Sequence, residues 1–471
     1  MHALIMGQSI LKVGLEHCKN LEDIRSAIRE YAKTNTTVPR ISCRGWMHSM
    51  TPDGVNSAML DDLDPLGRPI FVDTKDLHST WCSTTAVKEL DIQTTPDPVG
   101  GKIHRDADGN PTGLLEEAGV FTIVWPHIAR VASLEERAAA IRSAVEAYNT
   151  VGYTGLIDMA MDEDIWEALQ KLISDDPNIP MRFAAYWLIK PSATEAEHLK
   201  QVERAAELAA QFNATKSPGC RVVGIKIICD GIIDSCTASL KEPYSSNGAS
   251  TDAIWTKPQL LPVVRKADSL GLQVALHAIG DATIKMAIDV IEECVTPTRR
   301  PRIEHLELSS PEDAARLGRL GITASIQPVH SDPAILRAWP RLIGEHRCGR
   351  AFAYREFADG GAPLALGSDA PTAPHAPLAN MYVATTRRSA REPGPDGPAA
   401  FNEHFALGLC ESVVAGTKGA AYSTFAETWS GGLQAGMKAD FVVCDMEWEK
   451  EKLLAAKVSE TWFGGRRVYG A

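Results

Sequence analysis

The sequence lacks the cysteine pairs that a metal finger or a disulfide framework requires. Its ten cysteines are scattered between Cys18 and Cys444, and no two of them form a CxxC pair. This spread excludes a cysteine-based structural zinc site and favours reduced thiols, as in a cytoplasmic protein. The start of the chain has no basic segment before an apolar core, so we predict no signal peptide.

The sequence also lacks long apolar runs and an excess of positive charge. Nowhere do about 18 apolar residues follow one another, which is the length that crosses a bilayer, so we expect no membrane partner. The chain has 60 acidic and 48 basic residues and a formal net charge of -12, which on average repels nucleic acid. We therefore expect a cytoplasmic protein that acts on a small-molecule substrate, and the sequence leaves homo-oligomer formation open.

From about residue 130 onward, short apolar runs alternate with helical patterns, and each run ends in Gly, Asp, His or Pro. This alternation is expected of βα units around a parallel sheet. Two arrangements fit it: an open doubly wound sheet, and an eight-stranded barrel with one strand not counted. The runs lie near residues 152, 181, 221, 272, 300, 322 and 363.

The front of the chain is expected to hold the uncounted strand. The segment 20–33 has the pattern of a capped helix, so a first strand would end at about residue 2 and be almost wholly missing. Gly, Pro and Asp turns then interrupt the βα rhythm, and short alternating strands close the chain. The predicted parts are 1–39, the start of the barrel; 40–128, an insertion; 129–424, the remainder of the barrel; and 425–471, a small β-appendix.

Reactive side chains stand at the ends of the fourth to eighth predicted strands, where barrel enzymes place their chemistry: Lys226, His277, His305, His330 and Asp369. Imidazole and carboxylate ligands suit zinc or a similar divalent ion that keeps one position for water. We interpret His277 and His305 as metal ligands, and Asp369 as both a ligand and the general base. Each could instead be a helix cap or a satisfied core group, and Lys226 could be a salt-bridged lysine.

The phrases GIKIICDG, VALHAIGD, RIEHLEL, SIQPVH and LALGSDAP resemble the amidohydrolase family 3 branch of the amidohydrolase superfamily, which includes N-substituted formamide deformylases. The phrases PIFVDTKDLHSTWCSTTAV, GNPTGLLEEAG and GGLQAGMKADFVV resemble it too, so the similarity covers essentially the whole chain. The resemblance implies an α/β fold, a distorted TIM (β/α)8 barrel with an insertion and a small, here incomplete, β-sandwich. It also implies one or two divalent metal ions, usually zinc.

The resemblance also assigns roles to the residues at the strand ends. It implies that Lys226 is a lysine that can be carboxylated to bridge metals, and that His277, His305 and Asp369 are ligands on strands five, six and eight. His2 matches the second histidine of the HxH motif that ends the first barrel strand, and the first histidine of that motif is absent.

Three further residues are expected to line the substrate pocket. By this resemblance His330 falls on a QPxH motif, and His78 falls on a GH-like segment of the insertion, close to Trp81. We therefore predict a hydrolase that cleaves an amide or an N-substituted formamide with metal-activated water. The alternatives are a hydrolase of an ester or a cyclic amide, and a catalytically impaired, truncated protein on the same fold.

Overall fold

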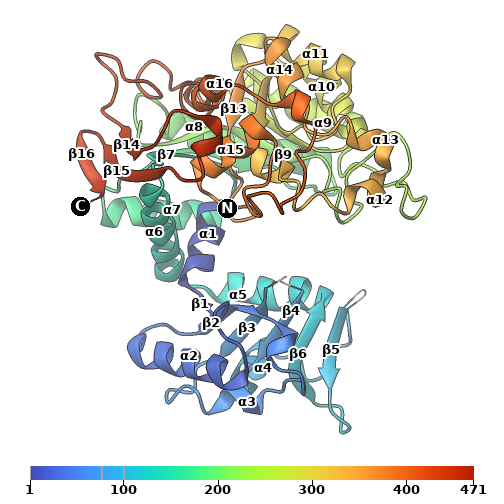
Figure 1. Cartoon of the computed structure of the whole chain (residues 1–471), viewed down its shortest axis with the longest axis vertical. Coiled ribbons are helices and arrows are strands. Elements are labelled where there is room, and N and C mark those ends of the chain that lie inside the picture. The colour runs from blue at the N-terminus through green and yellow to red at the C-terminus, as the bar shows by residue number, and fades with distance from the viewer. Residues whose placement is uncertain (1, 76–77, 99–100, 471) are drawn as a thin grey trace. The chain divides into compact units, whose positions relative to one another are not determined.

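The computed structural model describes residues 2–75, 78–98 and 101–470, which form two compact units (Figure 1). One unit comprises Met1–Ala3 and Ala144–Ala471, and the other comprises Leu4–Ser143. The predicted boundary between 1–39 and 40–128 therefore falls inside the second unit. Among the described residues, no helix combines the length and the apolar character needed to cross a bilayer.

The first unit is built on a curled sheet of parallel strands, one for each of the predicted apolar runs. The seven strands lie in the order β13-β12-β11-β10-β9-β8-β7, with every pairing parallel. Their carboxyl ends thus share one edge of the sheet. The strands are β7 (Gly155–Met161), β8 (Arg182–Leu188), β9 (Cys220–Ile228), β10 (Gln273–Ala278), β11 (Arg302–His305), β12 (Thr323–Ile326) and β13 (Leu364–Leu366).

The predicted eight-stranded barrel is present only as this seven-stranded part. In the described residues, β7 and β13 are the two edges of the sheet, and the chain from His2 to Leu11 is the helix α1 rather than the end of a strand. The backbone N–H groups of His2 and Ala3 donate to the Asp158 carboxylate of β7, at 3.3 and 3.1 Å. A carboxylate at a helix start satisfies N–H groups that have no partner within the helix.

Helices between the strands cover the sheet and are held by local caps. In α8 the Thr194 side chain and Glu197 form a capping box, and Asp162 caps α7 by accepting from Ile165 N. The longer helices of this unit are α6 (Leu134–Thr150), which begins in the second unit, α7 (Glu163–Asp175), α8 (Glu195–Gln211), α9 (Lys257–Ser269), α10 (Asp281–Cys294), α11 (Pro311–Arg319), α12 (Trp339–Ile343), α14 (Tyr354–Asp359), α15 (Pro377–Thr386) and α16 (Leu409–Val414).

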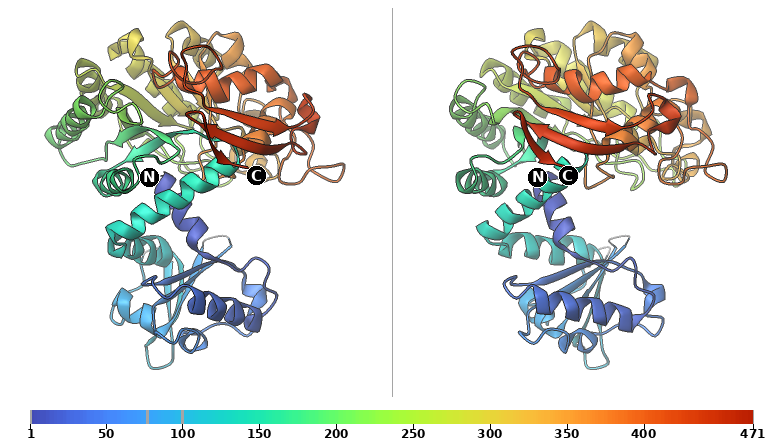
Figure 2. Two further views of the ribbon diagram at one scale, coloured as in Figure 1. Left: turned by 90° about the vertical axis from the view of Figure 1, so that its left-hand side faces the viewer. Right: turned by 60° about the vertical axis from the view of Figure 1, so that its left-hand side comes forward.

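The end of the chain forms a separate antiparallel sheet, drawn in red in Figure 2. It contains β14 (Phe441–Asp445), β15 (Lys457–Phe463) and β16 (Arg466–Tyr469). An ion pair of 2.9 Å joins Arg182 at the start of β8 to Asp440, and the Arg182 guanidinium lies 4.1 Å from the Phe463 ring centroid. The sheet therefore packs at the amino-terminal ends of the parallel strands, away from the edge that carries the reactive residues.

The second unit has its own mixed sheet and its own core. Its strand order is β1-β2-β3-β4-β6-β5, parallel from β1 to β3 and antiparallel beyond. The predicted helix is observed as α2, where Asn20 caps the start and the apolar side chains of Ile24 and Ile28 are buried against this sheet. Its elements include β1 (Val13–Gly14), α2 (Leu21–Thr34), β2 (Ile41–Trp46), α3 (Ala58–Asp61), β3 (Ile70–Thr74), β4 (Ser79–Cys82), α4 (Thr84–Leu90), β5 (Gly101–Arg105), β6 (Pro111–Glu117) and α5 (Trp125–Val131).

Candidate metal centre

His277 and His305 stand side by side at the carboxyl ends of β10 and β11. Their ring centroids are 4.4 Å apart. His277 Nε2 lies 3.3 Å from the carbonyl oxygen of Gly231, and because a carbonyl only accepts, Nε2 carries the ring proton and Nδ1 keeps its lone pair. Burial lowers the pKa of His277 to about 3 and holds the pKa of His305 well below its usual value. Both rings are therefore neutral at pH 7, the form that binds a metal.

His305 has a buried nitrogen with no protein partner. Its side chain is 8% exposed, and no hydrogen bond to Nδ1 is found within the described part of the chain. The backbone turns sharply at this point, since His305 and Leu306 have φ angles of 81° and 55°, a region that non-glycine residues rarely adopt. A buried polar atom without a partner is costly, so the position is suited to a ligand supplied from outside the protein.

Asp369 follows β13 and is surrounded by imidazoles. Its Oδ1 atom is 3.0 Å from His2 Nε2, its Oδ2 atom is 3.9 Å from His330 Nε2, and Thr372 Oγ1 donates to Oδ2 at 3.0 Å. Burial opposes ionisation of Asp369, but the hydrogen bond from His2 and the neighbouring imidazoles hold the pKa of Asp369 far below its usual value. Asp369 is therefore a carboxylate at pH 7, able to bind a cation or accept a proton.

The start of α1 brings His2 to this group from the far end of the sequence. His2 Nδ1 lies 3.0 Å from the Met159 carbonyl oxygen and so donates to it, which turns Nε2 toward Asp369. Burial alone would lower the pKa of His2, but the hydrogen bond to Asp369 and the charges of Asp369 and Asp158 raise it, so Nε2 can carry a second ring proton toward Asp369. A cation shared by Nε2 and Oδ1 would take the place of that proton. Ligands about 2.0–2.1 Å from a tetrahedral zinc ion lie roughly 3.3 Å apart, close to the 3.0 Å between Nε2 and Oδ1.

Lys226 lies on β9 next to the strand of His277 and is 4% exposed. Burial lowers the pKa of Lys226, while the charges of Glu304 and Asp369 oppose that shift. A lowered pKa increases the share of neutral amine, the nucleophilic form of a lysine. The structure thus places His2 beside Asp369 and His277 beside His305, with Lys226 on the strand next to that of His277. The role of these five residues as a shared set of metal ligands stays a prediction.

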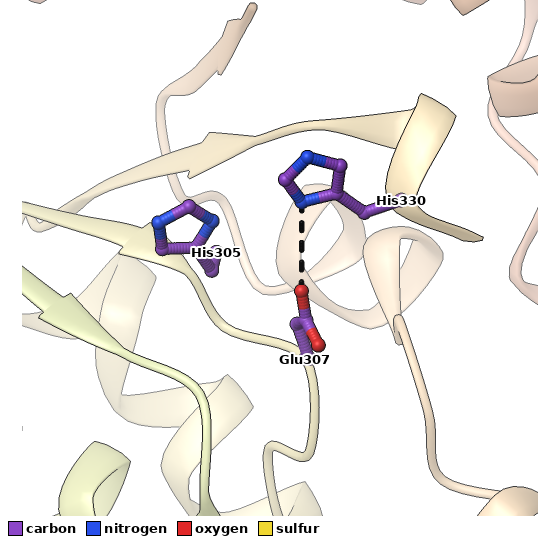
Figure 3. Close-up of side chains that lie close together, drawn as sticks. All are labelled: His305, Glu307 and His330. Carbon is purple, nitrogen blue, oxygen red and sulfur yellow. Dashed lines mark ion pairs between the residues drawn. The ribbon is translucent and has the colours of Figure 1, made fainter. Parts of the chain in front are cut away.

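Glu307 is a residue of this group that the sequence analysis missed. It is 6% exposed, its Oε1 atom lies 3.6 Å from His330 Nδ1, and burial raises the pKa of Glu307 (Figure 3). His305, Glu307 and His330 each offer a ligand atom within 4.8 Å of the others. Glu307 stands two residues after His305 and beyond the end of β11, where a strand pattern gives no signal for the direction of its side chain.

A cavity of about 160 Å³ opens beside the centre. Its lining includes His2 and Asp369 together with Tyr148, Tyr153 and Gln327. Gln327 Oε1 is a second buried atom without a partner in the described residues. The centre thus offers nitrogen and carboxylate ligand atoms, two neutral imidazoles, and buried polar atoms without partners in the described residues. These groups suit a divalent cation of the zinc type, and the cavity gives a small molecule access to that cation.

The other two predicted pocket residues belong to the second unit. His78 is exposed, and its Nδ1 atom lies 2.9 Å from Glu117 Oε2. Trp81 is fully buried in the core of that unit, 5.6 Å from the Trp46 ring, and its Nε1 donates to the Asn56 carbonyl at 2.9 Å. Trp81 thus has a structural role within its own unit, and the pocket role of both residues stays a prediction.

Comparisons with known proteins agree with the geometry. The profile of a family described as "Amidohydrolase family" matches residues 1–469. The chain is 28% identical to Protein LONG AFTER FAR-RED 3 of Arabidopsis thaliana, covering 100% of this chain and 80% of that protein. It is also 28% identical to the putative amidohydrolase YtcJ of Bacillus subtilis, with 100% and 87% covered. With the N-substituted formamide deformylase of Arthrobacter pascens the identity is 23%, with 82% and 70% covered.

A solved structure has the same fold. The crystal structure of an uncharacterized metal-dependent hydrolase from Pyrococcus horikoshii superimposes with a TM-score of 0.75 at 23% sequence identity. The match covers 93% of this chain and 82% of that one. At this identity the likeness establishes the fold, and the chemistry has to be argued from the residues of this chain.

Proposed function

Because the chain belongs to the amidohydrolase family, we propose that it is a metal-dependent hydrolase that cleaves a carbon-nitrogen bond other than a peptide bond. The proposed substrate is an amide or an N-substituted formamide, the class named by the Arthrobacter relative. One observation carries the proposal: four side chains from separate elements lie at one edge of the sheet. His2 is 3.0 Å from Asp369, and the His277 ring is 4.4 Å from the His305 ring.

We propose zinc or a similar divalent ion, one or two per chain, held by His2, Lys226, His277, His305 and Asp369. When bound, such an ion polarises a carbonyl group and brings the pKa of water near neutrality. The ionised Asp369 accepts the proton of the attacking water and returns it to the leaving nitrogen. Carboxylation of Lys226, which needs the neutral amine that burial favours, would turn this side chain into an oxygen ligand.

The surroundings of the centre suggest a small-molecule substrate rather than a macromolecule. A cavity of about 160 Å³ has room for a compact group, and the net charge of -12 disfavours nucleic acid. We propose that His330, which faces Asp369, binds the substrate. All ten cysteines are unpaired, which suits a cytoplasmic enzyme, and a homo-oligomer is compatible with this reading.

The test is metal content together with hydrolysis. The purified chain should contain a divalent metal by elemental analysis and hydrolyse some members of a panel of N-formyl and N-acyl amines. The double variant with His277→Ala and His305→Ala should lose both metal and hydrolysis. His404→Ala, which removes an exposed histidine far along the chain, is the matched control and should retain both. A folded wild-type chain that takes up no divalent ion would contradict the proposal.

A further inference from the structure

Glu307 is a buried carboxylate whose charge partner in the described residues is an imidazole. Within residues 2–75, 78–98 and 101–470, its only ion pair is the one with His330, at 3.6 Å. The backbone carbonyl of Glu307 is tied down separately, since it accepts from Phe352 N at 2.7 Å. Buried carboxylates are normally paired with a cation or bound to a metal, and a metal ion between Glu307 and the His330 nitrogen would take the place of the imidazole proton as that cation.

Two imidazoles face this carboxylate. The rings of His305 and His330 are nearly parallel, with centroids 5.8 Å apart and an angle of 9° between their planes. Figure 3 shows one nitrogen of the His305 ring on the side toward His330, with Glu307 directed at His330 from below. His305 Nδ1 has no partner within the described residues, and the His305 side chain is more than nine-tenths buried.

We propose that His305, Glu307 and His330 form a second divalent-cation site, separate from the ligand set of His277 and Asp369. Their ligand atoms lie within 4.8 Å of one another, and two nitrogens with one carboxylate oxygen suit zinc or a similar ion. His305 is shared, with one ring nitrogen for each ion. When both ions are bound, its single N–H proton is released to solvent.

This inference rests on the proposed function, because it adds a site to the same pocket. It changes the role of two residues: His330 becomes a ligand rather than only a substrate contact, and Glu307 supplies the negative charge of the site. With His330 Nε2 only 3.9 Å from Asp369 Oδ2, the second ion would lie next to the general base and bias the pocket toward anionic or strongly polar substrate groups.

The experiment is a zinc titration of the metal-stripped, full-length chain by calorimetry, with elemental analysis of the refilled protein. Wild type should bind two ions. The Glu307→Gln variant should bind one ion as wild type does and the other at least about 100-fold more weakly. Loss of a group that only hydrogen-bonds to a metal ligand weakens binding by roughly 10–100-fold, so a larger loss identifies Glu307 as a ligand. Asp234→Asn is the matched control, because it removes a nearby exposed carboxylate that accepts from Trp339 Nε1, and it should still bind two ions.

The two proposals fail in different ways. Two ions bound by Glu307→Gln with wild-type affinity, or a single ion in wild type that Glu307→Gln leaves unchanged, would overturn the second site and leave the hydrolase proposal intact. A wild-type chain that binds no ion would refute both. If Glu307→Gln does not fold, as judged by circular dichroism, His330→Asn provides the same measurement from the other side of the site and should also keep one ion.

Discussion

Asp369 contacts two imidazoles and one hydroxyl, and at the residue scale this makes it the sharpest test of the chemistry. Asp369→Asn keeps the shape of the side chain but removes the charge that accepts the proton. We expect kcat to fall by at least roughly 10²–10⁴-fold, the usual contribution of a general base, with the fold retained. Initial rates on the best substrate of the panel, with circular dichroism, measure this. The control is Asp359→Asn at an exposed ion pair, and full activity of Asp369→Asn would remove the proposed base.

His277 leads to a prediction about pH. The unfolded chain takes up a proton on this ring below its usual pKa of 6.5, whereas burial lowers the folded pKa to about 3. Between these values the unfolded state binds more protons, so acidification lowers the free energy of unfolding, by up to ~1.4 kcal/mol per pH unit for one ring. In urea unfolding of the metal-free chain, His277→Gln should therefore lose less stability than wild type between pH 6.5 and pH 4. Equal losses would refute the buried neutral form.

At the scale of elements, the close approach of β9 and β10 fixes the distance between Lys226 and His277. Gly224 is paired with Gln273, and a Cβ atom added to Gly224 would lie 2.0 Å from the Gln273 backbone oxygen. Gly224→Ala must push the strands apart, so we expect a loss of about 1–3 kcal/mol in unfolding free energy and a lower metal content. Gly219→Ala has open space around it and should change stability by no more than about 1 kcal/mol. Similar behaviour of the two variants would contradict this reading.

The same elements show how far the sequence could predict the fold. The seven parallel strands and the helix after Asn20 were predictable because apolar runs, turn residues and caps act locally. The predicted end of a first barrel strand near His2 was not observed, since the N–H groups there are taken by Asp158, a residue far away in the sequence. Hydrophobic periodicity contains no record of such a contact.

The residues of the candidate site likewise fall into those that a local sequence pattern predicts and those that it does not. His277, His305 and Asp369 could be predicted because each follows an apolar strand and parallel strands end at one edge. The 3.0 Å approach of His2 to Asp369 joins residues that are far apart in the sequence and has no local signal, so only the resemblance to the HxH motif indicated His2. Glu307 was missed because the left-handed turn at His305 ends the simple alternation of side chains that a strand pattern assumes.

At the scale of the whole molecule, the division into two units is itself testable. Residues 4–143 contain two complete apolar clusters, one around Trp46 and Trp81 and one around Phe71 and Leu115. A segment of about 140 residues is long enough to bury a core of its own. We therefore expect the fragment 4–143, expressed alone, to unfold cooperatively on heating, as followed by circular dichroism.

A shorter fragment, 4–75, is the matched control for this experiment. It lacks β4, β5 and β6, so the sheet loses its antiparallel half and both clusters are cut: Trp81 is removed from one, and Leu115 is removed from the other. Because a cooperative transition needs an intact core, the fragment 4–75 should show none. If the fragment 4–143 were equally unfolded, the second unit would depend on the residues after 143 for its stability, and this segment would be an insertion without autonomous folding rather than a domain.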